Sequence, residues 1–451
     1  SAIPFAYPPL GMYVAALLSA LGLPELKVLA WMPAIVNAAS IPAFYLLARL
    51  FMKDKAGAAA AAMIYALVPG NYAWQIMGGG VTRSFGVLFM IVADYSVLQM
   101  FRRPEWKYVW LSILLCALSV LSHPEVALAT ASSGVLFWAF YGRNRAGILR
   151  ASITALGVVL LTSPWWGSVL AASGLSPFLS VVHSGAYIAD PVRGLILDIF
   201  KLDLWTGLFH LLFLAGAAWN LYRRRFFLVI WMLLPYFVEP RSAPAPAYFP
   251  QSIMAAQALM EALPLIVQRL KGNALSEPYA DLVNRPAFQF GTLGLALLWF
   301  LQSGFFGYVL INTSLNPSAS LDVMSWVQQH VPEDGRFLIL TGKKGVMTDP
   351  IQEWFPALAG RRSQSTLQGL EWTLGPDFFP RLEALAALQE CREAACLEAW
   401  SARTGLPYGY VLLEKNAKSA HLLRSLEDDP AYARGFENSV YVVFARGDII
   451  P

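Results

Sequence analysis

The chain is poor in charged residues. Only 14% of its 451 residues are charged, 57% are hydrophobic, and the mean hydropathy is +0.51. Because about a quarter of the residues of a soluble domain are charged, this composition excludes a soluble globular protein and indicates a polytopic membrane protein. The net charge is only +4, and the basic residues lie in short clusters between apolar runs. Such clusters are typical of topology signals and argue against nucleic acid as a partner.

Cysteine is also scarce. Cys116, Cys391 and Cys396 lack the spacing of a zinc site, so no metal is expected. Cys391 and Cys396 lie in a stretch, 380–402, that we predict to be helical. They could pair outside the cytoplasm only if this helix broke, because the two Cα atoms must come within about 7 Å. We therefore expect free or loosely paired thiols. A P-loop, a dinucleotide fingerprint and a hydrolase triad are missing too, and no cofactor is expected.

Long apolar runs dominate the first 310 residues. The segment 8–23 is too short to span a bilayer and is expected to lie at the interface. Fifteen Lys and Arg residues fall in one set of alternating loops (49–55, 102–107, 143–150, 223–225, 269–285) and five in the other, so the first set is predicted to be cytoplasmic. The predicted transmembrane helices are 28–51, 56–70, 83–101, 107–121, 124–141, 147–171, 204–221, 225–238, 247–269 and 287–310.

The character of the chain changes after the last apolar run. Residues 321–330 have the pattern of an amphipathic helix, and 336–341, 408–413 and 439–445 have the pattern of strands. The sequence therefore predicts a polytopic α-helical membrane domain, 1–316, with about ten transmembrane helices and a short interfacial helix. A soluble α/β domain, 317–451, follows it. The alternation of basic loops places this second domain outside the cytoplasm.

The stretch 66–85, A-L-V-P-G-N-Y-A-W-Q-I-M-G-G-G-V-T-R-S-F, falls on the outer face. We predict that one helix ends at Pro69-Gly70, that a loop follows, and that the next helix begins at Thr82. Consecutive glycines, including Gly79 and Gly80, allow backbone N–H groups to approach an anion, and Arg83 adds positive charge at the start of the next helix. This combination is typical of a phosphate site. The alternative is a flexible hairpin whose arginine extends to the interface.

Other outer-face candidates lie in the turns. His123 and Glu125 could supply a general base or a phosphate partner; alternatively, Pro124 starts a helix with Glu125 in its first turn and His123 as its cap. Arg241 is a second candidate cation. The connection 172–203 could close over a lipid-linked substrate or form an ordinary interfacial helix. Residues 349–362 are predicted to be a loop, either facing the membrane site or packed by its own aromatic residues.

Asp94 is the only acid deep within a strong predicted span. An acid inside a membrane is a functional candidate by default. Its depth, about 16 Å below Arg83 at 1.5 Å per residue, places it away from an outer-face site. We therefore expect Asp94 to form hydrogen bonds between helices.

Three short segments together resemble a known superfamily. They are 6–10 (A-Y-P-P-L, with Tyr7), 49–57 (R-L-F-M-K-D-K-A-G) and 68–72 (V-P-G-N-Y). They are similar to the C-type superfamily of integral-membrane glycosyltransferases, which includes oligosaccharyltransferases and protein O-mannosyltransferases. The segments 163–166 (S-P-W-W) and 353–356 (E-W-F-P) are similar to bacterial family 39-like glycosyltransferases.

The resemblance implies transfer of a sugar from a polyprenyl-phosphate donor to a glycan, lipid or protein acceptor on the outer face of the membrane. On this hypothesis we predict that Arg83 and Arg241 neutralise the donor phosphate. The full set of predicted substrate-binding residues is Tyr7, Gly79, Gly80, Arg83, His123, Glu125 and Arg241. The superfamily's catalytic aspartate precedes the Y-P-P element, so it is expected upstream of Ser1. The oligosaccharyltransferases carry a second acidic, metal-binding motif, and the corresponding positions here, 78–83, contain no acid. A transporter or lipid flippase, or a non-catalytic binding or assembly protein with the same fold, are the alternative functions.

Overall fold

The computed structural model describes residues 6–76, 80–185, 191–200, 206–270, 285–314, 317–370 and 373–447. The chain forms two compact units, and each is considered by itself below. The helical unit comprises 5–174 and 185–307, and the α/β unit comprises 1–4, 175–184 and 308–451. The predicted division into membrane and extracytoplasmic domains at 316 stays a prediction.

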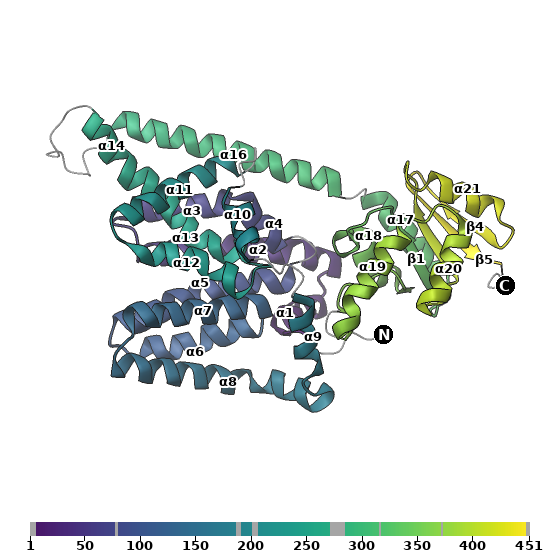
Figure 1. The fold of residues 1–451 in the computed structure, drawn as a ribbon, viewed down its shortest axis with the longest axis horizontal. Coiled ribbons are helices and arrows are strands. Elements are labelled where there is room, and N and C mark those ends of the chain that lie inside the picture. The colour runs from purple at the N-terminus through teal and green to yellow at the C-terminus, as the bar shows by residue number, and fades with distance from the viewer. Residues whose placement is uncertain are drawn as a thin grey trace. The chain divides into compact units, whose positions relative to one another are not determined.

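The helical unit follows the predicted apolar segments to within a few residues, and Figure 1 shows α5 to α8 running side by side. Its elements are α1 (Leu10–Ala20), α2 (Glu25–Ala48), α3 (Lys55–Leu67), α4 (Pro69–Ile76), α5 (Val81–Arg102), α6 (Lys107–Val120), α7 (Pro124–Tyr141), α8 (Arg145–Ser173), α10 (Pro191–Ile199), α11 (Gly207–Tyr222), α12 (Phe226–Val238), α13 (Pro244–Gln257), the π-helix η2 (Ala258–Ala262), α14 (Leu263–Leu270) and α16 (Pro286–Ser314). The last residues of α16 belong to the α/β unit.

Fewer helices than predicted are long enough to cross a membrane. Among the described residues, four are both long and apolar enough: α2, α5, α8 and α16. The helices α3, α6, α11 and α12 are apolar but shorter, because they end at tight turns. The prediction of ten spans is therefore not confirmed, although the protein is mostly helical as predicted.

The centre of the helical unit is α13. Every residue from Ala245 to Gln257 is buried, and α13 packs against α3, α11 and α12. The closest approach is at Gly216 of α11, where a Cβ atom would lie 1.9 Å from the Met254 carbonyl oxygen. Only glycine allows the two backbones to pass at this distance.

Basic loops gather at one end of the bundle, which we call the basic end. Arg150 donates hydrogen bonds to the carbonyl oxygens of Met100, Arg103 and Pro104, and so ties α8 to the α5–α6 turn. At the same end, Lys53 and Arg225 lie 3.4 and 3.7 Å from the carboxylate of Glu261, whose side chain is only 3% exposed.

The α/β unit has a five-stranded sheet in the order β2-β1-β3-β5-β4. Strands β2, β1 and β3 are parallel, and β5 and β4 add antiparallel partners. One face packs against α17 and α18 through Phe337 and Ile339, and the other packs against α19, α20 and α21 through Leu338 and Leu340. The bounds are α9 (Ser176–Gly185), α17 (Pro317–His330), β1 (Arg336–Leu340), α18 (Pro350–Ala359), β2 (Arg362–Ser363), α19 (Phe378–Leu388), α20 (Ala394–Thr404), β3 (Tyr410–Glu414), α21 (Ala420–Asp428), β4 (Tyr432–Glu437) and β5 (Tyr441–Arg446).

Two predictions in this unit were wrong. Residues 350–359 form the helix α18 rather than a loop, because Pro350 stands at its first position and the Asp349 side chain accepts a hydrogen bond from the Ile351 N–H. The predicted helix 380–402 breaks between Leu388 and Ala394. This break brings the Cα atoms of Cys391 and Cys396 to 5.6 Å, and the two residues form a disulfide instead of the expected free thiols.

Candidate functional site

The predicted site residues gather at one end of the helical unit, opposite the basic end. We call this end the site end. Arg83 is the third residue of α5, His123 directly precedes α7, Glu125 lies in the first turn of α7, and Arg241 lies between α12 and α13. Tyr7 joins them: its ring lies 6.1 Å from that of His123, and its hydroxyl oxygen lies 3.4 Å from that of Thr82. The structure thus brings together every described residue of the predicted site. Gly79 lies outside the described residues.

The approach to Arg83 differs from the prediction. Residues 69–76 form the helix α4 instead of a loop, because buried side chains fix the chain there. The Asn71 side chain donates a hydrogen bond to the Tyr65 carbonyl oxygen at the end of α3, and Gln75 donates one to Asn71. Gly80 then passes the end of α4 so closely that a Cβ atom would lie 1.7 Å from the Gln75 carbonyl oxygen. This glycine is therefore required by the turn itself.

His123 is held between aromatic rings. It is 6% exposed, and its ring meets those of Tyr7 and Trp74 edge to face, with the Trp74 centroid 5.8 Å away. Its Nδ1 atom is buried and has no hydrogen-bond partner among the described residues. Burial, then the positive charges of Arg83 and Arg241, lower the pKa of His123 to about 3. The imidazole is therefore neutral at physiological pH.

The alternative interpretation of this turn describes its backbone well. Pro124 is the first residue of α7 and Glu125 lies in its first turn. His123 occupies the N-cap position, but its side chain makes no capping hydrogen bond. Its ring nitrogens therefore do not cap the start of α7.

The site end carries both arginines and carboxylates. The Arg83 guanidinium lies 5.4 Å from the centre of the Trp74 ring, and the Arg241 guanidinium lies 3.7 Å from the Glu125 carboxylate. Glu239, at the end of α12, faces the same region. Burial, and to a lesser extent the Glu125 charge, raise the pKa of Glu239. Two arginines and two carboxylates therefore lie together at the site end.

Sequence analysis missed Trp74 and Glu239. Trp74 lies within the stretch that was singled out, but its role depends on α4 being a helix that turns the indole toward Arg83 and His123. Glu239 is two residues before Arg241, so its proximity to Arg241 could have been seen. Its raised pKa depends on packing that the sequence does not specify.

Asp94 does not behave as predicted. It is 1% exposed on α5, and both carboxylate oxygens lack a hydrogen-bond partner among the described residues. The expectation of hydrogen bonds between helices was therefore wrong. Asp94 shares α5 with Met90, Ile91 and Val97, which are buried in the hydrophobic core and offer no side-chain donors.

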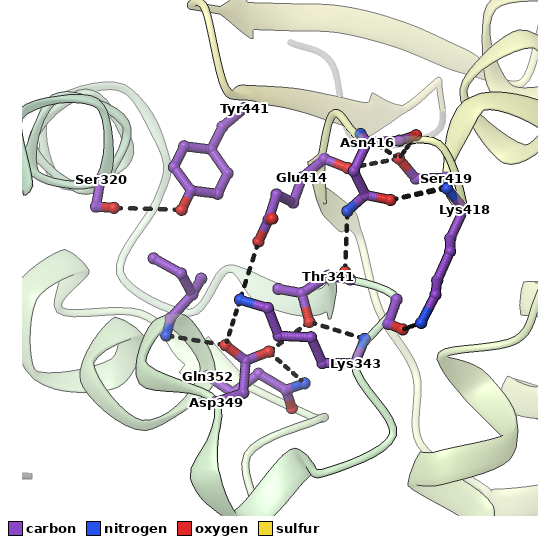
Figure 2. Close-up of polar contacts among 12 residues, drawn as sticks. Ser320, Thr341, Lys343, Asp349, Gln352, Glu414, Asn416, Lys418, Ser419 and Tyr441 are labelled. Atoms are coloured by element: carbon purple, nitrogen blue, oxygen red, sulfur yellow. Dashed lines mark hydrogen bonds and ion pairs between the residues drawn. The ribbon is translucent and has the colours of Figure 1, made fainter. Parts of the chain in front are cut away.

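In the α/β unit, Asp349 forms the centre of a polar cluster, shown in Figure 2. Its buried carboxylate accepts hydrogen bonds from the Thr341 hydroxyl and, at 3.3 Å, from the Gln352 amide. The Lys343 ammonium lies 3.9 Å from Asp349 and 3.6 Å from Glu414. These contacts join the carboxyl ends of the parallel strands β1 and β3 to α18. That 349–362 faces the membrane site stays a prediction.

Comparison with known proteins gives both a family match and a fold match. Residues 6–167 match the family described as dolichyl-phosphate-mannose-protein mannosyltransferase. A search of curated protein sequences found no match.

Among solved structures, the chain is similar to the archaeal oligosaccharyltransferase AglB from Archaeoglobus fulgidus in complex with an inhibitory peptide and a dolichol-phosphate. The identity is 17%, the TM-score is 0.52, and the match covers 99% of this chain and 68% of that one. The same oligosaccharyltransferase tethered to an acceptor peptide gives 15% identity, a TM-score of 0.50, and coverage of 98% and 66%.

A second similar structure is the arabinofuranosyltransferase AftD from Mycobacteria. It shows 16% identity and a TM-score of 0.50, over 95% of this chain and 36% of that one. The chain thus spans about two thirds of one relative and about a third of the other. Both are glycosyltransferases by name, and at these identities their likeness shows the fold of this chain. The resemblance predicted from the sequence is confirmed: in its N-terminal part and in its fold, this chain is similar to the C-type integral-membrane glycosyltransferases.

Proposed function

We propose that the chain transfers a sugar from a polyprenyl-phosphate donor to an acceptor on the outer face of the membrane, with the phosphate bound at the site end. The observation that carries this proposal is the convergence of Arg83 and Arg241 on the buried, neutral His123. The fold match to an oligosaccharyltransferase solved with a dolichol-phosphate supports the class of donor.

The two arginines would act on the leaving group. When the bond between the sugar and the phosphate breaks, negative charge builds up on the phosphate oxygens. Guanidinium groups fixed beside that position stabilise the charge more in the transition state than in the ground state. Arg83 is fixed by the start of α5 and the Trp74 ring, and Arg241 by its approach to Glu125.

The disulfide supports the placement of the α/β unit outside the cytoplasm. Disulfides persist in oxidising compartments and are rare in the cytosol. The pair Cys391–Cys396 lies in this unit, whereas the free Cys116 lies in α6 of the helical unit. The gathering of Lys53, Arg150 and Arg225 at the basic end supports the same orientation, since basic loops favour the cytoplasm.

The proposal is tested by replacing Arg83. Arg83→Ala should weaken binding of a polyprenyl phosphate, or sugar transfer, by about 2–5 kcal/mol, as the loss of one partner of a desolvated charge pair does. Arg83→Lys should recover only part of this loss, because lysine keeps the charge without the planar fork. Binding of undecaprenyl phosphate and transfer from a labelled donor would be measured side by side in nanodiscs.

The matched control is Arg145→Ala. Arg145 is an exposed arginine at the start of α8, on a loop of the basic end, and its loss should leave both measurements unchanged. Equal activity in all variants would mean that Arg83 is an interface residue. Binding without any transfer would favour the alternative of a binding or assembly protein, and transbilayer movement of the lipid without transfer would favour a flippase.

A further inference from the structure

His123 has a buried nitrogen without a partner, close to the two arginines of the proposed phosphate site. The ring is buried, and Nδ1 finds no partner in the described parts of the chain. A buried imidazole nitrogen without a partner costs free energy, which is recovered if a ligand fills the position. The edge-to-face contacts with Tyr7 and Trp74 hold the ring from two sides.

The groups around this ring come from every element packed against it. Arg83 lies at the start of α5, Arg241 lies between α12 and α13, and Glu125 and Glu239 lie near Arg241. Tyr7 and Trp74 are uncharged. Both arginines oppose protonation of the imidazole while the site is empty. A phosphate dianion between them would cancel their two positive charges and so remove this opposition.

We propose that His123 is a proton-coupled phosphate ligand: it is neutral in the empty site and binds a proton when a phosphate monoester dianion lies between Arg83 and Arg241. This inference rests on the proposed function and names a residue that recognises the leaving group. The dianion cancels the charge of the two arginines and accepts a hydrogen bond from the imidazolium. Both effects favour the charged ring.

The charge of the two lipid phosphates gives the coupling a direction. A sugar donor is a phosphodiester with one negative charge. In the transfer, the bond between sugar carbon and phosphate oxygen breaks, its electron pair stays on that oxygen, and the acceptor oxygen bonds to the sugar carbon. The acceptor hydroxyl releases one proton, and His123 takes up one as the product becomes a dianionic monoester. Proton uptake therefore accompanies the monoester product and not the diester.

The test is calorimetry of the full chain in nanodiscs with farnesyl phosphate, a short polyprenyl monoester. At pH 8 this ester is already a dianion. Titrations in two buffers of different ionisation enthalpy give the number of protons bound. We expect the wild type to take up about one proton per monoester. Its association constant should therefore fall by up to about tenfold for each unit by which the pH rises. Farnesyl methyl phosphate, a diester, should bind without proton uptake.

Variants then locate the proton. His123→Gln and His123→Asn should bind farnesyl phosphate without proton uptake and with little dependence on pH, whereas His421→Gln, an exposed histidine of the α/β unit, should behave as the wild type. Binding by the wild type without proton uptake, or equal uptake in wild type and His123→Gln, would overturn the proposal. Uptake in the wild type supports it even if the variants fail to fold. If the wild type does not bind the monoester while it binds the diester, this inference falls alone; if it binds neither, the proposed function falls with it.

Discussion

Glu261 and His123 lie at opposite ends of the helical unit and show two ways of burying an ionisable side chain. Glu261 lies within 4 Å of Lys53 and Arg225, so two cations offset the desolvation of its buried side chain. His123 has two cations nearby as well, but these repel its charged form, and the ring stays neutral. The neighbours are cations in both cases, so the outcome depends on whether the ionised form of the buried group is negative or positive.

The neutral state of His123 predicts how the stability of the empty protein depends on pH. Its pKa is lowered from 6.5 to about 3 on folding, so the unfolded chain binds more protons between these values. The free energy of unfolding is therefore not reduced by His123 above pH 6.5, and it falls as the pH falls below this value. At pH 5 the loss should be about 2 kcal/mol.

Thermal unfolding in detergent between pH 7.5 and 5 would measure this effect. His123→Gln should flatten the profile relative to the wild type, since glutamine does not titrate. His421→Gln, at an exposed position, should retain the wild-type profile. Parallel profiles for all three proteins would show that His123 does not determine the acid sensitivity.

At the scale of elements, the packing of α11 on α13 depends on Gly216. A methyl group there would overlap the Met254 carbonyl, so Gly216→Ala should force the two helices apart and cost about 1–3 kcal/mol. The matched change is Gly291→Ala in α16, where a Cβ atom meets nothing within 4 Å. It should leave stability unchanged or raise it slightly, because alanine favours helix more than glycine does. Thermal unfolding of both variants in one detergent would decide, and a neutral Gly216→Ala would contradict the close contact.

Helices whose bounds follow from the periodicity of apolar residues were predicted well. Helices whose bounds depend on side chains from distant parts of the sequence were predicted poorly. The apolar runs gave α5 and α7 to within about two residues, because burial in lipid or protein requires the same pattern. The helix α4 was missed, since Asn71 and Gln75 stabilise it through contacts with the end of α3. The break between α19 and α20 was missed as well. There, the Gln389 side chain donates a hydrogen bond to the Ile339 carbonyl oxygen of β1, a partner far away in the sequence.

At the scale of the molecule, the sequence predicted that the residues of the candidate site lie on one side of the membrane. It did not predict how their side chains are arranged there. Arg83, His123 and Arg241 all fall in loops that the distribution of basic residues places on one side, so their common location followed from topology. The burial of His123 did not follow. It requires Tyr7 and Trp74 to reach the same point from two other segments, and neither the periodicity nor the charge pattern specifies that.

The orientation itself is a prediction for the whole molecule. In intact cells, an impermeant thiol reagent should label a cysteine at the exposed position 322 of α17, introduced as Asp322→Cys, because the α/β unit is proposed to lie outside. It should not label Ala146→Cys, at an exposed position of the basic end. Both changes would be made in a Cys116→Ser background, and labelling after permeabilisation gives the total. The reverse pattern would move the site end to the cytoplasmic face.

The disulfide of the α/β unit also bears on the order in which the chain folds in time. Its two cysteines are only five residues apart, so they can meet as soon as this short segment emerges, provided that the unit lies in the oxidising compartment that we propose for it. Strands β3 and β5, which complete the sheet, are synthesised later. Closure of the small loop would therefore separate α19 from α20 before the sheet exists to hold them apart. A cell that delays oxidation would leave a nascent chain free to extend one continuous helix through 380–402, and this helix would have to be broken again before β3 could pair with β1.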